Sequence, residues 1–587
     1  MSMVKLQNHT SRNAFDLSRR NAFTAKVGEL LPVACIECIP GDKVKGRVQH
    51  FTRTMPVNTA AYTRIREYYD WYFVPTNLLW NKFNNFITQM QEQSNHAQSI
   101  ISSQRVGTTH PYFTFSQVAQ YINTMTSAAK KNQFGFSRSS LSVKLLNYLG
   151  YGDFSTAQGT ASGFFKENAN LNPFPLLAYQ KIYQDYYRHS QWEQASSSSF
   201  NVDYIASIQS SSNNLPISSL STGTYADVYN MFDLRYSNWN KDLFMGLSPN
   251  AQYGVSASIF VPTSTDVQHI SLVSGNPNQT GSALTLVNPS GGYNIQLSNG
   301  AAVRGELTID QIKQLQIKLG VNNISILALR QAEALQKWKE ITQSQQQDYK
   351  SQIEAHFGVS MSDAYSERCR YIDGSVSNLD ISEVTNTNIT SSNAANIAGK
   401  GVGVGDGSFS FSSDVHGYLM CIYHATPLLD YAISGINRTN LKTQVTDYAI
   451  PEFDRTGMVS VPLIELTNSS AASEFTTSGL LGYAPRYYEY KQAIDEVHGA
   501  FRNTLGSWVA PVSDGYITNY ISQLGFNGLT YQFFKVNPAT MNPIFAKAAD
   551  SSLDSDQLLV NSEAAELLVS SIRGTETIPV RSNSGIA

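Results

Sequence analysis

Cysteine and charge are both scarce in this chain, and each scarcity excludes a class of protein. Four cysteines in 587 residues, two close together and two far apart, form no disulfide framework of the kind that small secreted domains use. We therefore expect a compartment that does not depend on disulfides. Charged residues make up 15% of the chain, against a usual ~25%. The polar surface must therefore come from Ser, Thr, Asn and Gln.

Long apolar runs are absent as well. No stretch approaches the ~18 apolar residues that a membrane helix needs, and the N-terminal sequence lacks the apolar core of a signal peptide. We therefore expect neither membrane insertion nor export.

Aromatic residues, by contrast, are abundant, with 32 Tyr and 28 Phe. Interface cores are enriched in aromatics and depleted of charge, so this composition indicates surface that is buried against a partner. A β protein with a neutral surface has a similar composition, and composition alone leaves both interpretations open.

The segment LLPVACIECIP contains the C-x-x-C pair Cys35 and Cys38. Successive side chains of a strand point to opposite faces, so two residues an odd number apart cannot both face one metal ion. A redox C-x-x-C would open a helix, but Ile39, Pro40 and Gly41 follow here. The pattern therefore predicts a strand that ends in a turn at Pro40–Asp42.

Sequence typical of β-strands lies at both ends of the chain, and the segment between them mixes helical and strand patterns. This arrangement favours a mainly β fold, an eight-stranded antiparallel jelly roll with long mixed α/β insertion loops. We expect a basic N-terminal arm at 1–28, the first jelly-roll strands at 29–80 and a helical and loop insertion at 81–200. A further jelly-roll strand region follows at 201–255, and then a surface insertion at 256–370 that is β-rich over 256–305 and helical over 308–358. The remaining strands and loops lie at 371–587.

Three local signals support this division. Thr308 and Gln311 match a capping box at the start of the helical stretch, and Gly358 is placed to end it. The Asp373-Gly374 pair predicts a hairpin turn in the strand-like text that follows.

Several motifs resemble chemical sites but lack the required geometry. Gly401, Gly403, Gly405 and Gly407 resemble a phosphate-binding loop, but Asp406 replaces the last glycine of the motif and no helix follows. We expect a turn before a strand there.

A second group resembles metal ligands or acid–base pairs. His416 and His424 would lie about 27 Å apart on one face of a strand at ~3.4 Å per residue, with Cys421 on the other face, so we reject a metal site. The remaining candidates are the carboxylate pairs Glu452/Asp454 and Asp495/Glu496, which we expect on the surface. The sequence predicts no catalytic residue, no bound metal and no cofactor.

The N-terminal arm is the last candidate site. Its cations accompany Phe15 and Phe23, a combination that neutralises phosphates and stacks on bases in proteins that bind single strands. The alternative is a solvated arm laid over a neighbouring subunit. The residues expected to face DNA are Lys5, Arg12, Arg19 and Arg20.

Ordered segments at both ends of the chain resemble one family. FDLSRRNAFTAKVGELLPV, RTMPVNTAAYTRIREYYDWYFVPTNLLW, GYAPRYYEY and DQLLVNS resemble the major capsid proteins of microviruses, small icosahedral bacteriophages with single-stranded DNA, in their gokushovirus-like branch. We recognise no such pattern across about 81–170 and 256–300.

The resemblance implies a jelly roll that self-associates into a T=1 icosahedral shell around circular single-stranded DNA. Such a protein assembles in the bacterial cytoplasm and resides in the virion. It also implies that insertions such as 256–305 contact a bacterial surface receptor. Since a subunit of net charge −3 cannot neutralise a packaged genome, a small basic DNA-packaging protein is expected as a partner, with pilot and scaffolding proteins as further candidates.

Two other functions, carbohydrate binding and glycoside hydrolysis, compete with the capsid function. A carbohydrate-binding, adhesin-like β sandwich would use the aromatic and polar surface, but it usually carries an export signal. A jelly-roll glycoside hydrolase would require a cleft with paired carboxylates. The ordered family segments favour the capsid protein over both.

Overall fold

The computed structural model describes residues 13–58, 61–88, 109–126, 130–155, 169–205, 213–217, 220, 230–254, 284–287, 294–297, 326–346, 348–363, 366–385, 397–454, 456–468, 479–509, 511–517 and 529–571. The chain divides into two compact units, one formed by residues 1–251 with 342–587 and the other by residues 252–341.

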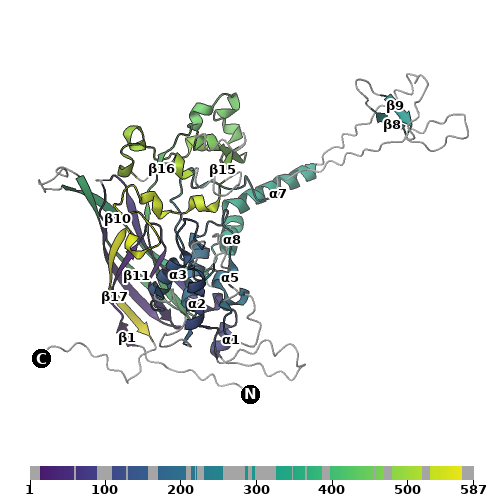
Figure 1. Cartoon of the computed structure of the whole chain (residues 1–587). Helices are drawn as coiled ribbons and strands as arrows, with labels where there is room; N and C mark the ends of the chain where they lie inside the picture. Colours follow the sequence, from purple (N-terminus) through teal and green to yellow (C-terminus); the bar gives the residue numbers. More distant parts are fainter. Residues whose placement is uncertain are drawn as a thin grey trace, which may run out of the picture. The chain divides into compact units, whose positions relative to one another are not determined.

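The larger unit is built on one curled antiparallel sheet, in which nine strands are described (Figure 1). The strands are β1 (Asn13–Asp16), β2 (Arg19–Ala25), β3 (Leu31–Cys38), β4 (Lys43–Thr54), β5 (Ile65–Pro75), β10 (Arg370–Thr385), β11 (Ile397–Ser412), β12 (Gly417–Pro427) and β17 (Leu558–Ser571).

Strand order identifies the fold. β1 and β2 pair with successive parts of β17 and share one position, so the sheet has eight positions in the order β1/β2, β17, β4, β11, β10, β5, β12 and β3. Numbered along the chain, these positions read 1-8-3-6-5-4-7-2, with hairpin neighbours such as β10 and β11 at the centre. This is the order of a jelly roll, and the predicted fold class is confirmed.

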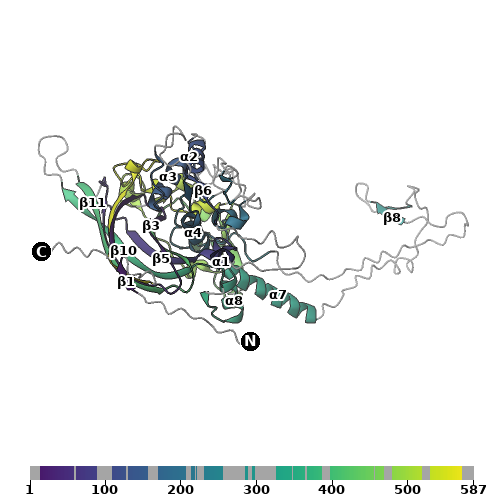
Figure 2. The same ribbon diagram turned by 90° about the horizontal axis from the view of Figure 1, so that it is seen from below.

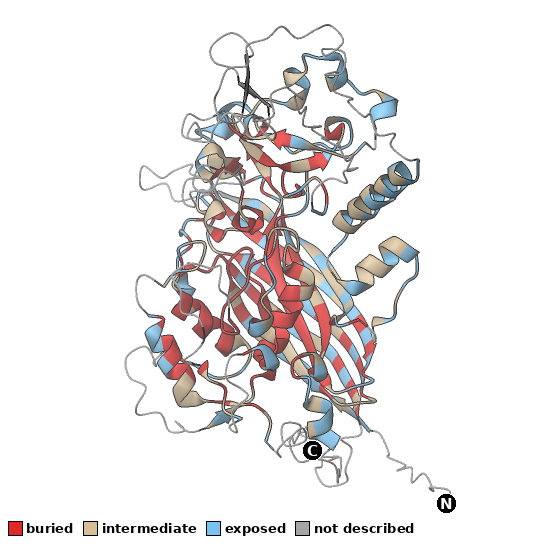
Figure 3. Ribbon diagram, turned by 90° about the vertical axis from the view of Figure 1, so that its right-hand side faces the viewer, coloured by how far each residue is buried: buried red, intermediate tan, exposed pale blue. Residues whose placement is uncertain are grey.

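Burial differs between the two halves of the sheet. β12 is buried at every residue, because its inner face lines the roll and helices cover its outer face. β4 alternates between buried and accessible residues along its whole length, so its outer face is open (Figure 3). Inside the roll, the Trp71 ring packs 4.2 Å from Phe409, and Phe73 packs 4.7 Å from Phe411.

The insertion between β5 and β10 supplies the helical layer of this unit. α1 (Phe83–Thr88), α2 (Phe115–Thr124), α3 (Arg138–Tyr148), α4 (Phe174–Ile182) and α5 (Ser197–Phe200) are its described helices before residue 251. α4 packs on β5 and β12, α3 packs beside β3, and Figure 2 shows α2, α3 and α4 together on one side of the sheet.

The C-terminal third adds short elements around the roll. Two-stranded sheets pair β13 (Asp430–Ala432) with β16 (Pro511–Ser513) and β14 (Met458–Pro462) with β15 (Leu480–Pro485), and β6 (Phe113–Thr114) pairs with β7 (Asn170–Leu171) in the helical layer. Short 3₁₀ turns are interspersed among the remaining described residues between 438 and 555.

The smaller unit contains the hairpin of β8 (Leu284–Val287) and β9 (Asn294–Leu297). It also contains most of α7 (Ile326–Ser344), whose Trp338 ring packs 6.0 Å from Tyr253. α8 (Tyr349–Phe357) follows in the larger unit and ends at Gly358, whose φ of 66° favours glycine. The predicted helical stretch and its end are thus confirmed where they are described, while Thr308 and Gln311 lie outside the described residues.

Three expectations of the sequence analysis need correction. The arm at 1–28 is not irregular from Asn13 onwards, because β1 and β2 join the main sheet by pairing with a strand more than 500 residues away. The 201–255 region contributes no strand to the main sheet in its described part, which holds a 3₁₀ turn at Val202–Tyr204 and isolated bridges. Apolar spacing there reflects packing against the helical layer.

The third correction concerns Asp373-Gly374, which forms no hairpin. β10 runs through this pair and stays hydrogen-bonded to β5, with a register shift between Tyr371 and Asp373. The extra residue is absorbed as a β-bulge, a use of Asp-Gly that its local sequence does not distinguish from a turn.

Candidate nucleic-acid interface on the open face of the sheet

The outer face of β4 carries a continuous row of residues suited to a polyanion. Lys43, Lys45, Arg47, Phe51 and Arg53 share this face with Gln49, and none of the six is buried. Alternate residues of a strand lie about 6.8 Å apart at ~3.4 Å per residue. The row therefore presents three evenly spaced cations, then an amide, an aromatic ring and a fourth cation.

The neighbouring strands extend this face. β17 and β11 flank β4, and their register places Leu559 and Val402 beside Arg53, and Asn561 and Val404 beside Phe51. Leu559 is 40% exposed and Val404 is 67% exposed. A hollow of about 450 Å³ opens between β2, β4 and β17, with Phe51 and Arg53 in its wall.

Cations outnumber acids on this surface. Arg47 forms an ion pair with Asp406 of β11, with Nη2 2.8 Å from Oδ2, and this exposed contact raises the pKa of Arg47. Across β17, the Arg20 Nε donates a 2.7 Å hydrogen bond to Asn561 Oδ1. The cations of this face are Arg20, Lys43, Lys45, Arg47, Arg53 and Lys400, and the acids interspersed with them are Asp16, Asp406, Glu563 and Glu566.

The structure separates the residues that the sequence grouped as a DNA-facing arm. Lys5 and Arg12 lie outside the described residues. Arg19 and Arg20 are both exposed on β2, but they are adjacent in a strand and so point to opposite faces, with Arg20 on the open face. The Phe23 ring is not available to stack on a base, because it is buried against Tyr423 with ring centroids 5.1 Å apart.

Sequence reasoning missed the β4 row, although its signal was present. KVKGRVQHFTR alternates cation and apolar residues with period two, which places every cation and Phe51 on one face.

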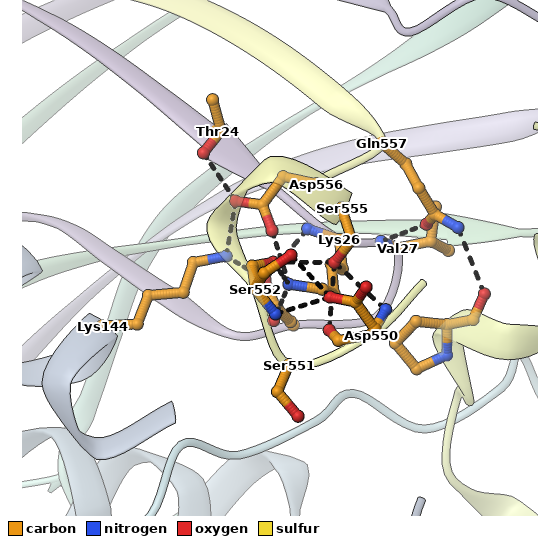
Figure 4. Close-up of polar contacts among 12 residues, drawn as sticks. Thr24, Lys26, Val27, Lys144, Asp550, Ser551, Ser552, Ser555, Asp556 and Gln557 are labelled. Carbon is orange, nitrogen blue, oxygen red and sulfur yellow. Dashed lines mark hydrogen bonds and ion pairs between the residues drawn. The ribbon is translucent and has the colours of Figure 1, made fainter. Parts of the chain in front are cut away.

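A buried ion cluster anchors this face to the helical layer (Figure 4). The Lys26 Nζ lies 2.6 Å from Asp556 Oδ1, and the Lys144 Nζ lies 2.6 Å from Glu29 Oε2 and 2.9 Å from Asp556 Oδ2. Thr24 Oγ1 donates a 2.5 Å hydrogen bond to Asp556. The cluster joins the end of β2, helix α3 and the turn before β17.

The charges of this cluster hold one another ionised. Burial alone would lower the pKa of Lys144, but the carboxylates of Glu29 and Asp556 raise it above its usual value. Burial alone would likewise raise the pKa of Asp556, but Lys144 and Lys26 lower it. All four side chains are almost completely buried, so each depends on its partners.

The motifs that resembled chemical sites occupy structural positions. Cys35 and Cys38 lie in β3, opposite Met420 and Gly417 of β12, so the predicted strand is confirmed. Burial raises the pKa of the Cys35 thiol to about 12. Within the residues that the structure describes, no group of three or more His, Cys, Asp or Glu side chains is arranged to hold a metal ion.

The glycine-rich segment, Cys421 and His424 belong to the sheet, whereas His416 lies in the bend just before β12. Gly401, Gly403, Gly405 and Gly407 lie within β11, where they face side chains of the neighbouring strands rather than an open loop. The expected turn is therefore wrong, since the strand begins before it. His424 is buried in β12, and burial lowers its pKa to about 3.

The carboxylate pairs lie on the surface and interact with cations. Asp454 Oδ1 lies 2.7 Å from Lys491 Nζ, and Asp495 Oδ2 lies 2.7 Å from Arg64 Nη2. Glu496 Oε2 lies 3.5 Å from His498 Nε2. None of the helices in the described ranges is long and apolar enough to cross a lipid bilayer.

An antiparallel sheet in jelly-roll order, covered by helical insertions on one side and open on the other, is an architecture of viral capsid proteins. Residues 2–137 and 150–545 match the family model for Capsid protein (F protein). The chain therefore belongs to this family of microvirus capsid proteins, which are structural components of the virion and not enzymes.

Two relatives are similar over most of their length. Capsid protein VP1 of Bdellovibrio phage phiMH2K is 22% identical over 516 residues, which cover 85% of this chain and 84% of that protein. Capsid protein VP1 of Chlamydia phage 1 is 24% identical over 538 residues, which cover 85% of this chain and 86% of that protein. This result decides against the adhesin and the glycoside hydrolase.

Proposed function

We propose that the chain self-associates into a T=1 icosahedral shell around a circular single-stranded DNA genome, with the open face of β4, β17 and β11 toward the DNA. The observation that carries the orientation is the row of Lys43, Lys45 and Arg47 on an accessible strand face. Phosphate neutralisation dominates binding to nucleic acid, and this row is suited to it.

Further cations belong to the same proposal. Arg20 lies on the open face beside the row, and we assign Lys5 and Arg12 to the DNA as well on their charge. Arg19 points to the opposite face of β2 and is not assigned to this surface. The net charge of −3 leaves most of the genome charge unmatched. A small basic packaging protein therefore joins the shell, and pilot and scaffolding proteins are further partners.

We also propose that the insertion at 256–305 contacts a receptor on the bacterial surface. Its hairpin of β8 and β9 belongs to a compact unit separate from the one that contains the jelly roll. A separate unit of this kind can vary without disturbing the sheet.

Sedimentation and negative-stain imaging of the purified protein test the shell. Closed particles of one diameter are expected, with or without added packaging and scaffolding proteins. A protein that stays monomeric with all of these partners would contradict the proposal.

Paired lysine variants test the orientation. Lys43→Gln/Lys45→Gln should leave particle size unchanged, weaken binding to single-stranded DNA, and reduce its salt dependence by about one unit of slope per cation. Lys82→Gln/Lys131→Gln removes two exposed lysines of the helical insertion and serves as the matched control. Equal losses in both variants would show that binding depends only on total charge and would overturn the assignment of this face.

A further inference from the structure

The hollow beside β4 combines an aromatic ring, a cation and apolar side chains in one accessible place. Its volume of about 450 Å³ falls within the ~300–1,000 Å³ of ligand sites. Its wall includes Ala22, Thr24, Phe51, Arg53, Leu559 and Asn561. The Arg53 guanidinium carbon lies 5.0 Å from the centroid of the Phe51 ring.

From this geometry we infer that Phe51 and Arg53 form a platform on which one unpaired base of single-stranded DNA stacks. Bases splayed out of a strand stack on aromatic rings and on guanidinium planes. In the hollow the Arg53 guanidinium lies over the Phe51 ring, so the two side chains form one stack that a base extends. Leu559 and Val404 provide apolar contact at the edge of the platform. This inference rests on the proposed function, because it requires the open face to meet the genome.

The charges around the hollow bind the phosphates that flank the stacked base. Arg20 lies on β2 beside the hollow and donates a hydrogen bond to Asn561 in its wall. Arg47, Lys45 and Lys43 continue along β4 in steps of two residues. A strand that tracks this row places its backbone over the cations and one base over Phe51. Phe51 is thus the one aromatic residue in the cationic row on β4.

A second capsid subunit is the competing occupant of this face, and the charge pattern disfavours it. The core of a protein–protein interface is depleted of charged residues. Here cations surround the apolar platform, and Arg53 forms part of it. Duplex DNA is disfavoured too, since its bases are paired and unavailable for stacking on a side chain.

Fluorescence anisotropy with the full-length protein tests the platform. The probes are a labelled oligothymidylate and an oligonucleotide of the same length that lacks bases. Phe51→Ala should weaken binding of oligothymidylate by about 5- to 150-fold, the range for stacking on one aromatic side chain, and leave the abasic strand unaffected. Phe51→Trp should preserve binding of both. Phe357→Ala removes an exposed ring from the end of α8 and is the matched control.

The outcomes separate this inference from the proposed function. An equal loss for both probes would overturn the platform, because Phe51 would then act through the sheet and not through a base. If Phe51→Ala changes neither probe while Lys43→Gln/Lys45→Gln weakens both, the platform is wrong and the DNA-facing surface stands. If no β4 variant changes binding, both are wrong. Loss of shell formation with DNA binding intact would assign the face to a subunit contact.

Discussion

The ammonium group of Lys144 is buried in the interior of the larger unit, where it contacts two carboxylates and no solvent. Its partners Glu29 and Asp556 come from opposite ends of the chain. Taking these charges out of water is unfavourable, and their mutual attraction offsets this only while each has a partner. The cluster therefore fixes how three distant segments meet more than it adds to net stability.

Removing the cation should expose this dependence. Lys144→Met leaves Glu29 and Asp556 with Lys26 alone, and we expect the free energy of unfolding to fall by about 3–5 kcal/mol. Urea denaturation followed by tryptophan fluorescence measures the change. The double variant Glu29→Gln/Lys144→Met should recover part of the loss, whereas Lys82→Met on the surface should have little effect. A loss below about 1 kcal/mol in Lys144→Met would contradict the coupling.

Asp70 provides a prediction of pH dependence. Burial raises its pKa to about 6, although hydrogen bonds from the hydroxyls of Tyr187 and Tyr371 act in the opposite direction. The Tyr187 hydroxyl donates to Asp70 Oδ2 over 3.0 Å. Between the unfolded pKa of ~3.9 and about 6, the folded protein holds a proton that the unfolded chain has released. The contribution of Asp70 to stability is therefore lost as the pH rises through this window.

Asp70→Asn removes this titration. The free energy of unfolding of the variant, relative to the parent, should rise by up to about 2–3 kcal/mol between pH 4 and pH 6 and stay level above that. Denaturation curves at a series of pH values give the difference, in which the titration of all other groups cancels. A difference that is constant with pH would show that folding leaves the pKa of Asp70 unchanged.

At the scale of the element, β11 shows how packing can reverse an intrinsic preference. Glycine in a strand interior is usually unfavourable by ~0.5–1 kcal/mol relative to alanine. Gly403, however, faces the fully buried Glu67, whose Oε1 accepts hydrogen bonds from Thr52 and Tyr423. A Cβ at this position would overlap the Glu67 carboxylate, which the hydrogen bonds from Thr52 and Tyr423 hold in place.

Gly403→Ala should therefore destabilise the protein by about 1–3 kcal/mol, the usual effect of overpacking. Ser408→Ala lies on the exposed face of the same strand and should change stability by less than about 0.5 kcal/mol. Thermal and urea unfolding of the two variants measure the contrast. A stabilised Gly403→Ala would mean that strand preference outweighs packing here.

At the scale of the whole molecule, the two ends of the chain complete one sheet. β17 lies between β4 and the strands β1 and β2, so the fold closes only when the last strand meets the first. Phe23 and Ala25 of β2 belong to the core of the roll. An uncovered β17 would present an unpaired edge, which promotes aggregation.

A series of N-terminal deletions tests this closure. Deletion through Arg12 should leave the far-ultraviolet circular dichroism and the solubility unchanged, since every described strand remains. Deletion through Ala25 removes β1 and β2 and should give insoluble protein. Deletion through Ser18 removes β1 alone and should lower stability without abolishing folding. Soluble, folded protein after deletion through Ala25 would contradict the role of β2.

Local patterns in the sequence account for a definite part of this structure. Strand-like sequence over 29–80 predicted the region of β3, β4 and β5, turn chemistry at Pro40–Asp42 separated the first two, and Gly358 ended α8. Alternation within this sequence contained the cationic row, because a strand's own backbone decides which residues share a face. The family, too, was recognisable from segments in order.

Tertiary structure alone decided the remaining features. Whether Asp373-Gly374 turns the chain or bulges within β10 depends on whether β5 continues beside it. Whether residues 13–25 form an arm or strands depends on an edge of β17 that is more than 500 residues distant. Local sequence determines backbone conformation and the alternation of faces, whereas long-range pairing determines which edges meet, which face the helices cover, and therefore which row of cations remains open.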